Sequence, residues 1–419
     1  EGRERLNDPT ALGFELARLY YLDRQPSSMI HELLNQVERK PEYLESIKGQ
    51  LQFYLRDEKD FALLQEMLEK RNKRHPGNPV YAELLIWRLI QQKEFKEALE
   101  LAINLDKQEE QGQRVLRIAG ICSANEAYEA AAKAYEYLID KGPDYPLYNT
   151  ARVNFLDARR KHLLSGDYKP ADLVQLEKDH QSLLQDLGKS QSTAPVMREL
   201  AMLKGRYLDK TGEAIALLEE TVALAPGGRF EAECKLDLGD LYILADDVWE
   251  ATLLYGQVEK AFKDNPLGQE AKFRNARLSY YIGEFEWAKG QLDILKASTS
   301  QLMANDALNL SLLISENPGP DSSYGALKMY AAAELLAFRN QQDKAIATLD
   351  SIHRRFPGHA LNDDILMAKA GIFIRRGQLD LALAALNSVT KDYAHDIWAD
   401  DALFKLGELY ETRLGDPEK

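Results

Sequence analysis

Few residues of this chain have types and spacings that could carry out chemistry. His353, His359 and His395 could together hold a metal ion. However, no cysteine accompanies them, and no two of them have the i, i+4 spacing that puts two ligands on one helix face. We therefore interpret them as surface histidines, and we expect neither a metal site nor a cofactor.

Three pairs of consecutive aspartates could suggest a divalent ion, and they are Asp246-Asp247, Asp363-Asp364 and Asp400-Asp401. Each pair lies near the expected start of a helix. There, carboxylates cap free amide groups and meet the positive end of the helix dipole, which explains the pairs without an ion.

Gly227-Gly228 could suggest a phosphate-binding loop, but no strand precedes it, as a dinucleotide site would require. A turn at a helix end is the simpler interpretation. Since no catalytic triad is recognisable either, we predict that the protein is not an enzyme.

Composition narrows the possible partners. The chain has 419 residues, with 53 Lys and Arg against 67 Asp and Glu, a formal net charge of −14, and no basic block. This balance argues against nucleic acid or an anionic membrane as the main partner. No apolar run is long enough to cross a bilayer, although a position at the membrane periphery stays open. Cys122 and Cys234 stand far apart along the chain, and we expect both to be buried thiols that do not pair.

The elements that must position any site are helices, because sustained alternation of apolar and polar residues is absent. The clearest pattern lies in residues 232–266. Leu238-Gly239 and Tyr242 are followed by Ala251 and Tyr255 at the spacing of a helix hairpin, in which small residues let two antiparallel helices touch. We expect Gly239 and Ala251 to face each other. This pattern resembles the tetratricopeptide repeat.

The same pattern recurs along the chain. The small or apolar residue that opens each second helix falls at Leu64, Ala98, Ala131, Ala214, Ala251, Ala288, Ala345 and Ala382. Most neighbours in this set lie about 33 to 37 residues apart, close to the period of the family. The interval from Ala131 to Ala214 fits two repeats, and the interval from Ala288 to Ala345 leaves room for one extra helix near residues 300–323. The predicted fold class is all-α, and the resemblance implies an α-solenoid, a right-handed superhelix of helix hairpins.

The register predicts three segments. Residues 1–143 form N-terminal repeat-like hairpins, residues 144–297 form a central array with a degenerate long repeat, and residues 298–419 hold the extra helix and the C-terminal repeats. The last repeat is incomplete, because Leu406-Gly407 and Tyr410 match only a first helix. We expect a further helix beyond Lys419.

The resemblance also implies which residues face the concave surface. In this family the first helix of each hairpin lines that surface, and its template positions correspond here to Asp237, Asp240, Phe273, Arg274, Arg277, Tyr280, Tyr281, Tyr330, Glu334, Phe338, Arg375 and Phe404. Aromatic and arginine side chains are enriched in binding hot spots, so we predict that these residues bind a partner. For any single aromatic, the alternative is packing against the neighbouring helix.

One known ligand class of the family is not expected. Its chaperone-tail clamp needs lysine and asparagine at two template positions, and these positions here hold Leu236 and Asp240, Phe273 and Arg277, or Tyr330 and Glu334. We therefore do not expect carboxy-terminal chaperone peptides as ligands.

Residues 356–410 look like the envelope-associated bacterial branch of the family, which includes periplasmic Tol-Pal coordinators and outer-membrane assembly lipoproteins. The resemblance rests on Phe356-Pro357 and on Asp-Asp pairs before first helices, as in Asp400-Asp401-Ala402-Leu403. It implies a non-catalytic interaction scaffold of a bacterial cell envelope, periplasmic or associated with the outer membrane. Such a scaffold would bind a protein or peptide within a multi-protein complex. The alternatives are a cytoplasmic regulatory or adaptor module that senses a peptide, and an enzyme with a pocket built by repeats.

Overall fold

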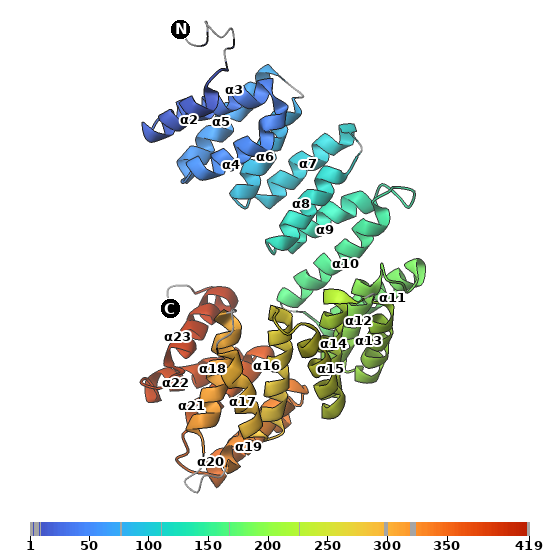
Figure 1. Cartoon of the computed structure of the whole chain (residues 1–419), viewed down its shortest axis with the longest axis vertical. Helices are drawn as coiled ribbons and strands as arrows, with labels where there is room; N and C mark the ends of the chain where they lie inside the picture. The colour runs from blue at the N-terminus through green and yellow to red at the C-terminus, as the bar shows by residue number, and fades with distance from the viewer. Residues whose placement is uncertain are drawn as a thin grey trace. The chain divides into compact units, whose positions relative to one another are not determined.

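The computed structural model contains α-helices and, over the residues it describes, no β-strand (Figure 1). These residues are 3, 8, 10–75, 78–109, 111–166, 168–225, 227–296, 301–318 and 324–416. The all-α prediction is therefore confirmed. The chain groups into two compact units, residues 1–172 and 173–419, and each is described by itself. The division into three segments by repeat register stays a prediction.

The first unit is a series of helix hairpins. Its helices are α2 (Gly13–Leu22), α3 (Pro26–Arg39), α4 (Leu44–Tyr54), α5 (Glu58–Arg74), α6 (Pro79–Gln91), α7 (Phe95–Glu109), α8 (Gln113–Ala124), α9 (Tyr128–Ile139) and α10 (Tyr148–Ser165). Local chemistry sets several of the starts. The Asp57 carboxylate accepts a hydrogen bond from the Asp60 amide at the start of α5, and Asn78 caps α6 just before Pro79.

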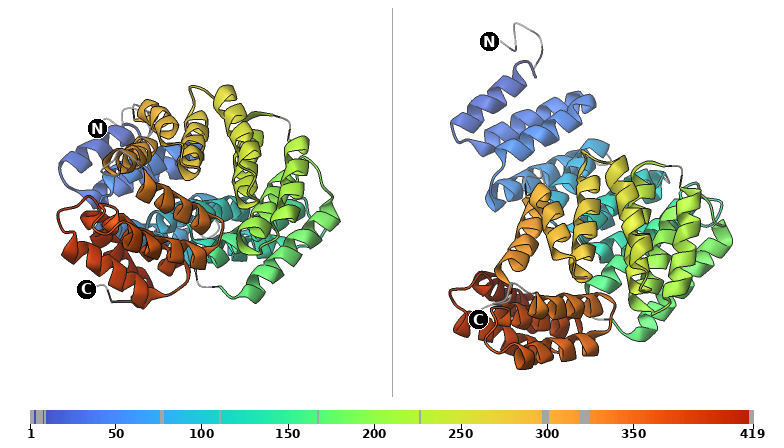
Figure 2. Two further views of the ribbon diagram at one scale, coloured as in Figure 1. Left: turned by 90° about the horizontal axis from the view of Figure 1, so that it is seen from below. Right: turned by 60° about the horizontal axis from the view of Figure 1, so that its bottom comes forward.

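The second unit continues the same hairpin pattern (Figure 2). Helix α11 (Pro170–Leu187) begins at the junction, and the helices that follow are α12 (Ala194–Tyr207), α13 (Thr211–Leu224), α14 (Gly228–Leu244), α15 (Val248–Ala261), α16 (Pro266–Tyr281), α17 (Phe285–Leu295), α18 (Gln301–Glu316), α19 (Gly325–Phe338), α20 (Gln342–Arg355), α21 (Asn362–Arg375), α22 (Leu379–Asp392) and α23 (Ala399–Leu409). A π-helical turn, Tyr410–Leu414, extends α23.

The repeat register read from the sequence is confirmed. All eight residues that were expected to open a second helix, from Leu64 to Ala382, have an exposed fraction of 0%. The interval from Ala131 to Ala214 holds α10, α11 and α12, and α12 packs against α13 as a hairpin. The extra helix is α18, while residues 300 and 319–323 of the expected range lie outside the described residues.

The helix starts explain the aspartate pairs and the glycine pair. The Asp247 carboxylate accepts a hydrogen bond from the Glu250 amide at the start of α15, and the other two aspartate pairs lie in the first turns of α21 and α23. Gly227 caps α14, which begins at Gly228, and both glycines have positive φ angles of 91° and 77°. The glycine pair is therefore a turn before a helix.

The close contact between the two helices of the repeat at residues 232–266 differs from the expected one. A Cβ atom placed on Gly239 would lie 2.5 Å from Cε1 of Tyr255, so the glycine makes room for the tyrosine ring and not for Ala251. A glycine-alanine contact does occur one hairpin earlier, where a Cβ on Gly205 would lie 3.2 Å from that of Ala214. The prediction identified the need for a small residue at Gly239 but not its neighbour, because helix spacing does not specify how a ring is oriented.

Gly239→Ala is expected to lower the free energy of unfolding by about 1 to 3 kcal/mol, despite the better helix propensity of alanine. The Tyr255 ring cannot move aside, because it is fully buried and its hydroxyl donates a hydrogen bond to Asp240. In the matched control, Gly256→Ala on α15, the added Cβ meets nothing within 4 Å. The control should therefore gain about 0.5 to 1 kcal/mol. Thermal melting of the two variants checks the opposite signs, and a stabilised Gly239→Ala would contradict this account of the packing.

Candidate partner-binding site

A groove of about 500 Å³ opens on the first helices of the hairpins in the second unit. Its walls come mainly from α12, α14, α16, α19 and α21, which are the helices that the family resemblance assigns to the concave surface. The groove brings together five of the predicted binding residues, which are Asp240, Tyr281, Glu334, Phe338 and Arg375.

The groove exists because the array turns back on itself after α18. In an open solenoid, each repeat touches only its neighbours. Here Arg339 donates to the carbonyl oxygen of Ile243 at 2.8 Å, and the Asn340 side chain donates to that of Arg206 at 3.0 Å, so the end of α19 contacts α12 and α14. In addition, the Tyr280 hydroxyl donates to Glu334 at 2.7 Å and joins α16 to α19. Helix α19, which follows the extra helix, therefore closes the groove from the side opposite α12 and α14.

An arginine lies among aromatic rings at the wall of the groove. The guanidinium carbon of Arg277 lies 5.8 Å from the ring centre of Phe273, 6.0 Å from that of Tyr281 and 5.8 Å from that of Phe338. Within the described part of the chain, Arg277 forms no ion pair. Cation-π contacts hold this guanidinium in place and leave its hydrogen-bond donors available.

A second arginine, Arg375, projects from the last turn of α21 into the groove. Its side chain is exposed, and none of the described carboxylates forms an ion pair with it. The groove walls still displace enough water to lower the pKa of Arg375, with a smaller opposing effect from Tyr281. An anion placed beside this guanidinium would restore the lost stabilisation of its charge.

Glu334 also lines the groove, and the charge of Arg277 acts on its carboxyl group. Desolvation raises the pKa of its carboxyl group, while the Tyr280 hydroxyl and the charge of Arg277 oppose that rise. Since burial disfavours its ionised form, Glu334 is a weak counter-charge for the arginines around it.

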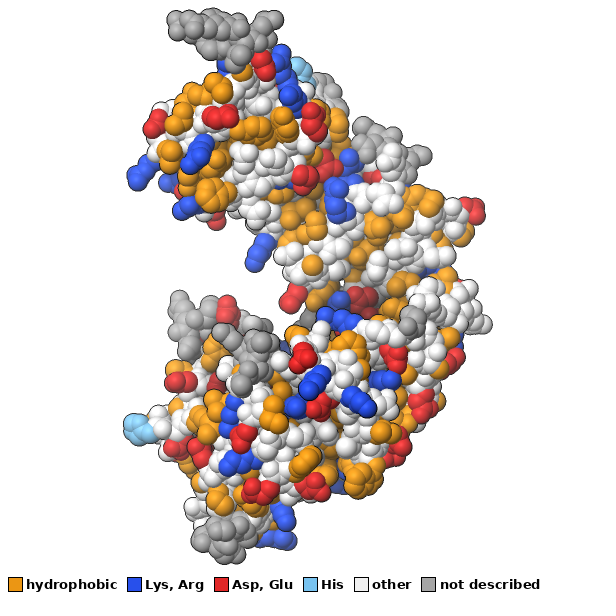
Figure 3. Space-filling model, viewed as in Figure 1, with side chains coloured by type: hydrophobic (Ala, Val, Ile, Leu, Met, Phe, Trp, Pro, Cys, Tyr) orange, Lys and Arg blue, Asp and Glu red, His pale blue; other side chains and the backbone are white. Residues whose placement is uncertain are grey.

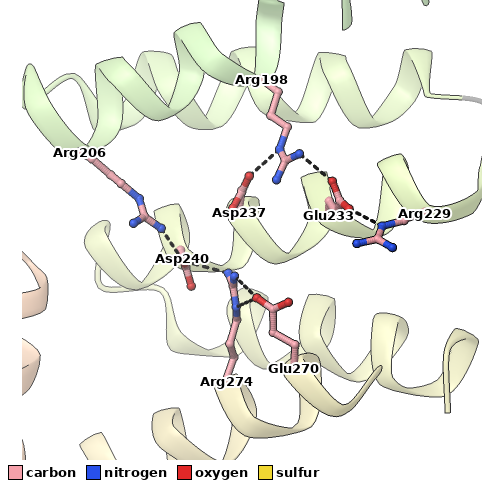
Figure 4. Close-up of polar contacts among 8 residues, drawn as sticks. All are labelled: Arg198, Arg206, Arg229, Glu233, Asp237, Asp240, Glu270 and Arg274. Atoms are coloured by element: carbon pink, nitrogen blue, oxygen red, sulfur yellow. Dashed lines mark hydrogen bonds and ion pairs between the residues drawn. The ribbon is translucent and has the colours of Figure 1, made fainter. Parts of the chain in front are cut away.

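Three predicted binding residues form ion pairs that join neighbouring helices, and they are Asp237, Asp240 and Arg274 (Figure 4). The Asp240 carboxylate accepts from Arg206 of α12 at 2.6 Å and from Arg274 of α16 at 3.0 Å. Arg198 of α12 also donates to Asp237 of α14, at 2.7 Å. These groups stiffen the walls. Arg198 and Arg206 on α12 were not among the predicted residues, because the template positions were assigned only from α14 onward.

The remaining predicted residues do not line the groove. Tyr280 is fully buried and Tyr330 is 5% exposed, so both pack in the core of the second unit. The Tyr330 hydroxyl donates to the Asp364 carbonyl oxygen at 3.2 Å. Phe273 lies half-buried beside Arg277, and Phe404 on α23 is 75% exposed. Tyr280 and Tyr330 therefore pack against neighbouring helices, which was the alternative to partner binding.

The described residues offer little other chemistry. Among them, no group of three or more histidine, cysteine or acidic side chains could hold a metal ion, and no helix is long and apolar enough to cross a membrane. Cys122 and Cys234 are free and buried, as expected, and burial raises the pKa of their thiols to about 11 and about 12. On the face drawn in Figure 3, acidic and basic side chains are interspersed.

Comparison with known proteins agrees with the helical-repeat architecture. Residues 329–359, which cover most of α19 and α20, match the tetratricopeptide repeat family. No curated protein matches the chain.

Three solved structures are similar to the chain. The first is a tetratricopeptide repeat protein from Parabacteroides merdae, with 13% identity, a TM-score of 0.38, and a match that covers 70% of this chain and 98% of that one. The second is yeast Tom70, with 12% identity, a TM-score of 0.38, and coverage of 97% of this chain and 90% of that one. The third is the human IFIT1 dimer with PPP-AAAA, with 14% identity, a TM-score of 0.37, and coverage of 92% of this chain and 91% of that one. This chain is thus an all-helical repeat protein that carries a tetratricopeptide repeat at residues 329–359.

Proposed function

We propose that the protein is a non-catalytic scaffold of a bacterial cell envelope, and that it binds a segment of a partner protein in the groove of its second unit. One observation carries the proposal. Arg375 lines the groove, Arg277 packs against aromatic rings that line it, and neither arginine has an ion-pair partner in the described residues. Arginine and aromatic side chains at the centre of a concave surface are typical of binding hot spots.

The charges at the groove indicate the kind of segment that it accepts. The chain as a whole is acidic, with a net charge of −14, yet Arg206 and Arg375 line the groove and Arg277 packs against its aromatic rings. A segment that brings a carboxylate next to aromatic or aliphatic side chains would complement both features. Because Arg277 and Arg375 belong to different helices, they supply two separate anchor points along such a segment.

The envelope setting is supported by the motif that resembles periplasmic members of the family. One residue of an Asp-Asp pair in the motif makes a contact between repeats, since Asp364 Oδ1 accepts a hydrogen bond from Trp398 Nε1 at 2.6 Å, which joins the starts of two successive repeats. The motif therefore has a packing role between neighbouring repeats. We propose a periplasmic or outer-membrane-associated location on this resemblance.

The proposal is tested by placing the photo-crosslinking residue p-benzoylphenylalanine at Phe338 in the groove. The matched control places it at Trp249 on α15, which is 79% exposed and does not line the groove. In cells that make the natural protein, we expect a specific crosslinked protein from the envelope fraction with the Phe338 variant alone. Equal products from both positions would contradict the groove, and products only from cytosolic proteins would contradict the envelope setting.

A further inference from the structure

The groove of the second unit has a gap in its wall on α21. Met367, Gly371 and Arg375 follow each other at intervals of four residues, so they lie along one face of the helix, and all three line the groove. The middle position of this face has no side chain. Ala368 lies beside it on α21, and Ala337 lines the groove from α19. We call the space over Ala337, Ala368 and Gly371 the slot.

The chain itself does not fill the slot. Outside the backbone of α21, a Cβ atom placed on Gly371 would meet one described atom within 4 Å, which is Nη1 of Arg375 at 3.9 Å. At Gly239, by contrast, the added Cβ would lie 2.5 Å from the Tyr255 ring, so the packing of the chain requires that glycine. Glycine inside a helix lowers stability relative to alanine. Gly371 carries this cost without such a packing neighbour, and it leaves room for a group from outside the chain.

Apolar side chains border the slot. Met367 of α21 and Phe338 of α19 both line the groove and are half-buried, so solvent reaches them. The centre of the Phe338 ring lies 6.2 Å from that of Tyr281, which also lines the groove. Thioether and aromatic groups make favourable contacts with the edge of an aromatic ring. A flat ring placed over the small residues of the slot would therefore meet suitable groups at its edges.

The guanidinium group of Arg375 lies at the edge of the slot. Its Nη1 is 3.9 Å from the position of a Cβ on Gly371, its side chain is exposed, and none of the described carboxylates forms an ion pair with it. A guanidinium can stack on a ring through its face while its N–H groups donate to a carboxylate. One arginine can therefore recognise both groups of a ligand when they are close together.

We propose that the slot binds an aromatic side chain of the partner segment, and that an acidic residue two positions away on that segment pairs with Arg375. The inference rests on the proposed function, since it concerns the same groove. Gly371 and Arg375 are one helical turn apart, which is about 6 Å along α21. Side chains two residues apart on an extended segment point to the same side and are separated by about 7 Å. The segment therefore matches the spacing of the slot and the guanidinium, and Gly371 is the residue that determines specificity.

The proposal is tested with the full chain and two N-acetylated tripeptide amides of opposite order, Phe-Ala-Glu and Glu-Ala-Phe. Saturation-transfer NMR at neutral pH should show binding of at least one of them with a Kd on the order of 1 mM. In the peptide that binds, replacing Phe by Ala or Glu by Gln should weaken binding roughly tenfold, because these changes remove the ring and the charge in turn. Binding that does not depend on the ring, or no binding of either peptide, would overturn the proposal.

Variants locate the peptide. Gly371→Leu fills the slot and should weaken binding at least about tenfold. Gly290→Leu is the matched control, because this glycine of α17 lies outside the groove and an added Cβ meets nothing within 4 Å, so binding should not change. Arg375→Ala should remove the difference between the Glu and Gln peptides. Melting temperatures show whether the variants fold, and Arg375→Ala alone tests the site if Gly371→Leu does not. Unchanged binding in a folded Gly371→Leu, or an unchanged difference in Arg375→Ala, would overturn the proposal.

The slot and the proposed function can fail separately. If crosslinking at Phe338 captures an envelope partner while the tripeptides bind without preference for the ring, the slot is wrong and the groove stands. If the tripeptides show the preference and no partner is captured, the scaffold proposal is wrong and the slot stands as a binding site.

Discussion

Replacing Arg277 and Arg375 together by alanine is expected to weaken capture of the groove partner by at least about a hundredfold. Removal of one charged hydrogen-bond donor from a desolvated interface typically costs 1.5 to 3 kcal/mol, roughly a factor of ten or more for each arginine. Arg375 lines the groove and Arg277 lies against its aromatic rings, both without a described ion-pair partner, so a carboxylate of the partner would lose both of its ionic contacts.

This loss should occur with little change in stability. Arg375 forms no described ion pair that its removal would break, and Arg277 is held mainly by three aromatic rings. Tyr281 is a poorer target for mutation, because its ring packs against both Arg277 and Phe338 and its loss would disturb the wall itself.

Arg376→Ala is the matched control. Its guanidinium lies next along the chain, but it pairs with the exposed Asp343 at 2.7 Å and does not line the groove. Biolayer interferometry with the partner identified by crosslinking should give the parent affinity for this control. If the double variant also retains the parent affinity, the groove is not the binding site.

The helices and their pairing were predictable because they depend on local spacing. A small residue is needed wherever two antiparallel helices touch, and positions such as Ala98 and Ala345 are fully buried at such contacts. The extra helix was predictable for a similar reason, since an interval longer than one repeat must hold additional structure.

The site was predictable only in part, because it depends on contacts between distant residues. Template positions identified the helix face that carries Tyr281, Phe338 and Arg375. They could not show that the array turns back after α18, which buries Tyr280 and Tyr330 and brings Arg339 to the carbonyl of Ile243. Nor does helix periodicity show whether a charged residue is paired.

Asp240→Ala is expected to lower the free energy of unfolding by about 3 kcal/mol. The Asp240 carboxylate is almost fully buried and accepts hydrogen bonds from Arg206, Arg274 and Tyr255. Removing one member of a buried ion network leaves the others without compensation, which typically costs 3 to 5 kcal/mol. The lower end applies here, because the side chain of Arg206 is 43% exposed and can be hydrated.

Thermal melting of the variant should show a decrease of roughly 6 to 12 °C for a unit of this size. The melting temperature of Asp240→Asn should fall between those of the parent and of Asp240→Ala. An amide oxygen still accepts a hydrogen bond from Tyr255, while the negative charge is lost. Asp343→Ala is the control, since it breaks an arginine-aspartate pair of similar length at an 88% exposed carboxylate and should cost less than about 1 kcal/mol.

A double-mutant cycle separates the network from the carboxylate itself. Asp240→Ala leaves Arg274 paired with Glu270 alone, and Arg274→Ala removes the other half of the same Asp240 contact, so the combined cost of both changes should be smaller than the sum of the single costs. Strict additivity would mean that the two groups stabilise the fold independently. Because Asp240 also lines the groove, Asp240→Ala should reduce both stability and partner capture, whereas the Arg277 and Arg375 changes should reduce capture alone. This difference distinguishes residues that hold the walls in place from residues that contact the partner.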